Sequence, residues 1–146
     1  MKPEAIRWRV LAVFATCVAF YAAFFAGTEH FRRHRGPWEV SFSPDASGRP
    51  MLQIAQQKLG IQNVNLVFVD GQLPAGFVSN RVSFDRPHQR LDLPYGTVRF
   101  LDTTFLPGTV TLEIFGHEVE LLPRVLIVDK QEHRWKSGLT LALTHR

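Results

Sequence analysis

The sequence contains a single cysteine, Cys17, among its 146 residues. One thiol forms no internal disulfide, and the patterns of several cysteines that hold structural zinc are missing as well. The chain also has no glycine-rich phosphate loop and no dinucleotide-binding fingerprint. The folded part must therefore be stabilised by an apolar core, and no short motif assigns it an activity.

Charge is missing from one long stretch. Residues 10–26 contain no Asp, Glu, Lys or Arg, and at about 1.5 Å per residue a helix of this length nearly crosses a hydrocarbon core of about 30 Å. We predict one membrane-spanning helix over residues 10–27, between a short tail (1–9) and a basic juxtamembrane segment (28–36). The residues expected to contact lipid headgroups are Trp8, Arg9, Arg32, Arg33 and Arg35.

A basic tail followed by an apolar run is also found in cleaved signal peptides. Cleavage after Ala26 would place Phe24 at the −3 position, where a small residue is needed, so we expect an uncleaved anchor. Three basic residues flank each end, and their charge does not set the orientation. The short tail favours a cytoplasmic N-terminus, with the rest of the chain in the periplasm, as for a single-pass protein of a bacterial inner membrane.

The predicted helix separates small from bulky side chains. At about 100° per residue its aromatic residues gather on one side, and its alanines gather on the other: Ala12, Ala15, Ala19, Ala22, Ala23 and Ala26. Small side chains let the backbones of membrane helices approach closely. The pattern predicts that the alanine face packs on another transmembrane helix, in a second copy or a larger complex, unless the segregation arose by chance.

Histidine is absent at membrane depth, so the span offers no good ligand for a haem or chlorophyll metal. His30 and His34 lie four residues apart beside Glu29, a spacing that can bind a metal. Neighbouring arginines and the lack of further ligands favour a solvated helical turn instead. We therefore expect no metal and no cofactor.

The calculated pI of about 9.7 would suit a nucleic-acid-binding protein, but the location of the charge argues against one. Residues 36–146 carry eleven Lys and Arg and eleven Asp and Glu. The basic excess therefore lies in the membrane flanks, where anionic lipids account for it. We expect membrane lipids as partners and no nucleic acid.

After Pro37 the apolar residues alternate with a period of two, as in half-buried strands. The chain is predicted to be mainly β, with one N-terminal transmembrane helix followed by a small antiparallel β-sandwich or barrel over residues 37–146. Segment 85–96 is expected to be a loop, either a crossover between two sheets or a binding element. Gly116-His117 is expected to form a two-residue hairpin turn. The predicted strands are 38–43, 51–56, 65–69, 77–84, 97–102, 109–115, 118–122, 124–129, 132–136 and 139–144.

No catalytic constellation emerges from the residue pattern. The serines fall in predicted strands or turns, without the context of an activated nucleophile. His117 and Glu118 are neighbours, but adjacent strand residues point to opposite faces, so His117 is expected to be a polar turn residue. Several carboxylates could meet in space as in glycosidases, yet nothing singles out a pair. We expect the protein not to be an enzyme.

Four residues are candidates for a partner-binding surface: Trp38, His88, Tyr95 and Trp135. The leading hypothesis is a non-catalytic accessory subunit that packs its helix in a larger membrane complex, respiratory or photosynthetic for example, and braces or caps it with the β-domain. The second hypothesis is a membrane-tethered binding module for a glycan or peptide. A membrane-anchored hydrolase is the third.

Overall fold

The computed structural model describes residues 3–86 and 91–144. The chain divides into two compact units, Met1–His34 and Arg35–Arg146. The first unit is a helix and the second is a β-sandwich, so the predicted fold class is confirmed.

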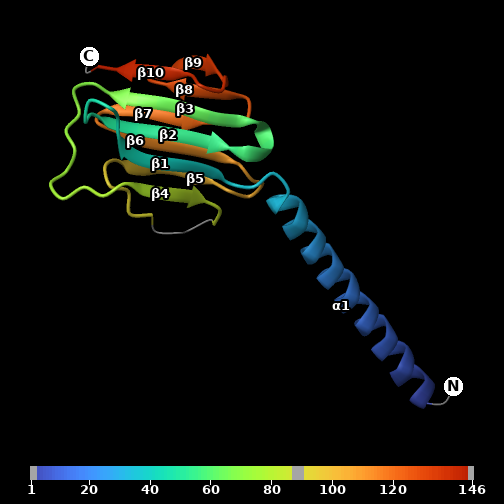
Figure 1. Cartoon of the computed structure of the whole chain (residues 1–146). Helices are drawn as coiled ribbons and strands as arrows, with labels where there is room; N and C mark the ends of the chain where they lie inside the picture. Colours follow the sequence, from blue (N-terminus) through green and yellow to red (C-terminus); the bar gives the residue numbers. More distant parts are fainter. Residues whose placement is uncertain (1–2, 87–90, 145–146) are drawn as a thin grey trace. The chain divides into compact units, whose positions relative to one another are not determined.

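The helix α1 runs over Pro3–Arg33 (Figure 1). Glu4 in its first turn and Arg32 and Arg33 in its last turn complement the helix dipole. The helix stops before Gly36, whose φ of 74° is incompatible with an α-helix. Within Glu4–Arg33, an 18-residue window has a mean hydropathy of 2.1, and none of its residues is buried. α1 is therefore long and apolar enough to cross a membrane, and it continues through the basic segment.

In the described part of the chain, ten strands form two five-stranded sheets, which we name sheet A and sheet B (Figure 1). Sheet A has the order β10-β3-β2-β1-β4, and its strands are β1 (Trp38–Pro44), β2 (Pro50–Gln56), β3 (Ile61–Phe68), β4 (Asn80–Phe84) and β10 (Thr140–Leu143). Sheet B has the order β5-β6-β7-β8-β9, and its strands are β5 (Thr97–Asp102), β6 (Thr109–Ile114), β7 (His117–Leu121), β8 (Val125–Val128) and β9 (Gln131–Arg134). Each segment named as a strand or candidate strand overlaps one of these strands, with shifted ends.

Alternation along the strands places one face of each sheet in a common core. In β1 the side chains of Trp38, Val40 and Phe42 are fully buried, and the residues between them are partly exposed. Fully burying an apolar side chain of this size stabilises the fold by about 1.5–3 kcal/mol. The fully buried apolar residues are Trp38, Val40, Phe42, Leu52, Ile54, Val64, Leu66, Phe84, Val110, Leu112, Ile114, Val119, Leu121 and Leu126.

Three local features differ from the predictions or decide between them. β10 pairs with β3 in parallel, whereas the other strand pairs are antiparallel. The segment between β4 and β5 joins an edge strand of sheet A to an edge strand of sheet B, so it is the crossover. The β6–β7 turn is Phe115-Gly116, not Gly116-His117, because both turn residues have positive φ (50° and 78°) as a type I′ turn requires.

Buried Gln56 fixes the first residues of the β-domain. Its Nε2 donates to the carbonyl oxygens of Arg35 (2.6 Å) and Gly36 (2.8 Å), and its Oε1 accepts from the amide of Leu59 (3.0 Å). Only 1% of the Gln56 surface is exposed, so water cannot substitute for these bonds.

Replacing Gln56 with methionine, which is similar in size but has no amide, should lower the free energy of unfolding by on the order of 3 kcal/mol, because three backbone groups lose a buried partner. Urea unfolding of the full chain in detergent micelles, followed by the fluorescence of the buried tryptophan, measures the change. Gln53→Met, on the outward face of the same strand, is the control and should change stability by less than about 0.5 kcal/mol. Equal losses in the two variants would contradict the role of the buried amide.

Candidate functional site

Trp38 lies in the core rather than on a partner-binding surface. It is fully buried, because the odd-even alternation of β1 turns it inward. Its Nε1 donates to the carbonyl oxygen of Gly108 (3.0 Å). This hydrogen bond connects β1 of sheet A to the segment before β6 of sheet B. The ring packs against that of Trp135, with centroids 5.0 Å apart. The placement of Trp38 among the partner-binding candidates was therefore wrong.

Trp135 is partly buried against the same core. Its Nε1 donates to the carbonyl oxygen of Leu122 (2.8 Å), so the polar edge of the indole is already used within the domain. The rest of the side chain is only partly exposed.

Tyr95 is also a core residue, and its placement among the partner-binding candidates was wrong as well. It is 7% exposed, its hydroxyl donates to the carbonyl oxygen of Met51 (2.8 Å), and its ring contacts Phe42 and Phe115 with centroids 5.0 and 5.1 Å away. Burial raises the pKa of Tyr95 to about 12. The fourth candidate, His88, lies outside the described residues.

His117 is not the polar turn residue that the residue pattern predicted, because it is the buried first residue of β7. It is 6% exposed and turned inward, and its Nδ1 lies 2.6 Å from Oδ2 of Asp129. Oδ1 of the same carboxylate accepts from the amide of Glu118 (3.0 Å). The signal was available in the sequence, because Val119 and Leu121 share the strand parity of His117 and were expected to face the core.

A cleft of about 220 Å³ opens beside this pair, lined by His117, Asp129, His133, Leu141 and Leu143 among others. The carboxylate of Asp129 fixes the orientation of the His117 imidazole. Within residues 3–86 and 91–144, no group of three or more His, Cys, Asp or Glu side chains is placed to hold a metal ion. The contacts of Asp129 with His117 and with the amide of Glu118 link the start of β7 to the β8–β9 turn.

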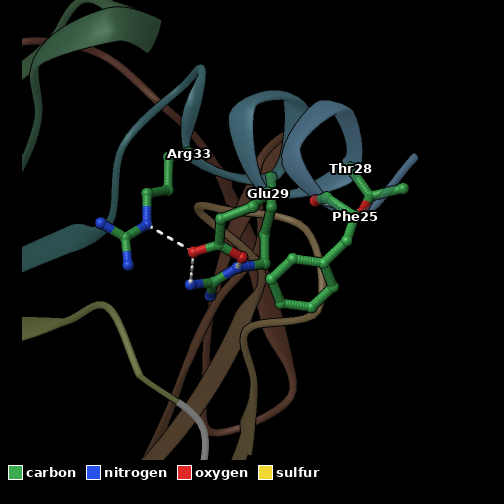
Figure 2. Close-up of polar contacts among 5 residues, drawn as sticks. Phe25, Thr28, Glu29 and Arg33 are labelled. Carbon is green, nitrogen blue, oxygen red and sulfur yellow. Dashed lines mark hydrogen bonds and ion pairs between the residues drawn. The ribbon is translucent and has the colours of Figure 1, made fainter. Parts of the chain in front are cut away.

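Glu29, Arg32 and Arg33 form a cluster of charged side chains at the C-terminal end of α1 (Figure 2). Arg32 donates to both oxygens of Glu29 (2.9 and 2.8 Å), and Nε of Arg33 donates to Oε1 (2.7 Å). Thr28 directly precedes Glu29, and its hydroxyl donates to the carbonyl oxygen of Phe25 one turn earlier (2.9 Å). The Arg32 hydrogen bonds, helped by Arg33, lower the pKa of Glu29 to about 2. Glu29 is therefore an anion at any physiological pH and offsets part of the basic charge.

The alanine face of α1 is uncovered within its own unit. All six alanines are exposed, and so are Trp8, Arg9 and the aromatic residues of the opposite face. Thr16 beside them donates its hydroxyl to the carbonyl oxygen of Ala12 (2.8 Å), so the helix itself satisfies this polar group. The face is thus smooth and needs no polar partner.

The β-domain exposes two phenylalanines that the residue pattern did not single out, Phe100 in β5 and Phe105 just after it, at 54% and 70%. β5 is an edge strand of sheet B. A register shift between Val98 and Phe100 turns both Arg99 and Phe100 outward, and Arg99 pairs with Glu113 of the next strand. An edge strand with exposed aromatic rings is a surface on which another strand can pair.

Comparisons of the chain with protein-family models, with curated proteins and with solved structures found no match.

The Glu29 cluster predicts a pH-dependent contribution to the stability of the helix end. Because the pKa is lowered on folding, the contribution is complete above about pH 4.5 and is lost as the pH falls through about 2. A carboxyl titration of the full chain in neutral-lipid nanodiscs, by ¹³C NMR, should show Glu29 titrating near 2. In the Arg32→Gln, Arg33→Gln double variant its pKa should return to the ordinary glutamate value of 4.5. Arg35→Gln is the control, and an equal shift in that variant would contradict the assignment.

Proposed function

We propose that this chain is a non-catalytic, single-pass membrane subunit whose helix packs against other transmembrane helices of a larger complex. Its β-domain then braces or caps that complex on the extracytoplasmic side. The observation that carries the proposal is the uncovered alanine face, which runs from Ala12 to Ala26 on a helix long enough to span a bilayer. The second support is the exposed pair Phe100 and Phe105 on the β5 edge.

The helix contact relies on close packing. Lipid tails are as apolar as leucine, so membrane helices gain little from hiding apolar surface from each other. Side chains that end at Cβ let two backbones approach, and the resulting van der Waals contacts drive association. The basic residues beyond both ends of the span hold the helix at a depth where its alanine face meets a neighbour.

The β-domain contact relies on apolar burial and strand pairing. The domain has no net charge, so long-range attraction by charge contributes little. Burying a phenylalanine ring stabilises a contact by about 1.5–3 kcal/mol. The free backbone groups of β5 supply hydrogen bonds to a partner strand beside the two rings.

Filling the alanine face should release the chain from its complex. The triple variant Ala15→Leu, Ala19→Leu, Ala22→Leu keeps the span apolar but separates the backbones, and its affinity for the complex should fall at least about tenfold. Native gel electrophoresis of membranes in mild detergent measures co-migration with a larger assembly.

The matched control replaces the opposite face, with Phe20→Leu, Tyr21→Leu and Phe24→Leu, and should co-migrate like the wild type. The proposal fails if the wild-type chain runs alone, if the alanine variant still co-migrates, or if mass spectrometry shows a mature chain that begins after residue 27.

Polar replacement of the exposed rings should weaken the second contact. Phe100→Ser with Phe105→Ser should reduce recovery of the complex at least about threefold, while the free energy of unfolding changes by less than about 0.5 kcal/mol per site because both rings are exposed. Val78→Ser is the control, since Val78 is 78% exposed and lies outside sheet B. Equal recovery of all three proteins would show that the β5 edge is not the docking surface.

A further inference from the structure

The outer face of sheet A, turned away from the core, contains a hollow of about 300 Å³. It has this shape because short side chains lie between long ones. Ser41 pairs with Arg81 on one side and with Gln53 on the other, and Ala55 lies opposite Glu39. The lining residues are Glu39, Ser41, Gln53, Ala55, Gln57, Ile61, Gln62, Asn63 and Arg81.

Side chains on two sides of the hollow contact each other in pairs. On one side Arg81 forms an ion pair with Glu39. On the other side Nε2 of Gln53 donates to Oδ1 of Asn63 (2.9 Å). Asn63 has a φ of 54°, at the point where the register between β2 and β3 shifts. Such bulges re-aim side chains, and here Gln62 and Asn63 both become exposed beside the hollow.

The chemistry of the lining selects a neutral ligand rich in hydroxyl groups. Among the described residues that line the hollow, Arg81 is the one Lys or Arg and Glu39 the one Asp or Glu, and the two form an ion pair. The amides of Gln53, Gln57, Gln62 and Asn63 and the hydroxyl of Ser41 offer donors and acceptors in one small area. A sugar hydroxyl likewise both donates and accepts, so neighbouring groups of a glycan match this lining.

An extended peptide fits the hollow less well. The backbone groups of the central strands are used in the sheet, so a peptide cannot add to this face as a further strand. Among the described residues that line the hollow, Ile61 is the one large apolar side chain, and it is 4% exposed. A peptide side chain would therefore find no apolar pocket there.

We propose that this hollow on sheet A binds a short segment of a neutral glycan. Its volume is at the lower end of small-molecule sites, which suits a contact with one or two sugar rings of a longer polymer. The site is separate from the alanine face and from the β5 edge, and it does not depend on the accessory-subunit function.

Saturation-transfer NMR on the full chain in nanodiscs tests the proposal, with two probes, N,N′,N″-triacetylchitotriose and maltotriose, and a Gly-Ser hexapeptide for comparison. We expect saturation transfer to at least one of the two sugars and none to the peptide. The double variant Gln53→Ala, Asn63→Gly keeps the positive φ of residue 63 but removes both amides, and it should weaken sugar binding at least about tenfold.

A second variant, Ala55→Leu, fills the hollow and leaves its polar groups in place, and it should abolish the transfer. Gln131→Ala, an exposed amide of β9 outside the hollow, is the control and should bind like the wild type. The proposal is overturned if neither sugar binds or if the peptide alone binds. It is also overturned if the two hollow variants bind the sugars as well as the Gln131 variant does, with all of them shown to be folded by near-ultraviolet circular dichroism.

Discussion

The two sheets pack on one apolar core, and the hydrogen bond from the Trp38 indole to the carbonyl oxygen of Gly108 links β1 of sheet A to the segment before β6 of sheet B. Gly108 is at φ 72°, and a Cβ there would lie 1.9 Å from the carbonyl oxygen of Asp102, so no other residue fits. The same short segment carries Phe105 to the surface while Leu106 is buried. The hydrogen bond in the core therefore holds the end of a segment that exposes Phe105 and buries Leu106.

The fold could be predicted from the sequence because period-two alternation and an uncharged apolar run are local signals. Sequence patterns could not give the parallel pairing of β10 with β3, since that pairing depends on how the whole of sheet B packs. The turn after β6 was misplaced by one residue because Gly116 fits either turn position. Phe115 with positive φ is uncommon for a bulky side chain, so its place in the turn had no strong local signal.

The candidate site was harder to predict because burial is a property of the folded chain. Trp38 and Tyr95 are amphipathic, and their polar atoms reach backbone carbonyls that are distant in the sequence. The partnership of His117 with Asp129 likewise depends on two turns meeting at one end of sheet B. The alanine face, in contrast, depends only on helical periodicity, and α1 is helical over all six alanines.

The parallel pairing of β10 with β3 has a consequence for biosynthesis. All of sheet B is synthesised between these two strands, so sheet A lacks its last neighbour while the ribosome makes β5 to β9. During that interval β3 exposes an unpaired backbone edge beside Leu66 and Phe68. A nascent chain that stalls before β10 therefore exposes an unpaired strand edge that is prone to aggregate, and such chains are substrates for chaperones and proteases.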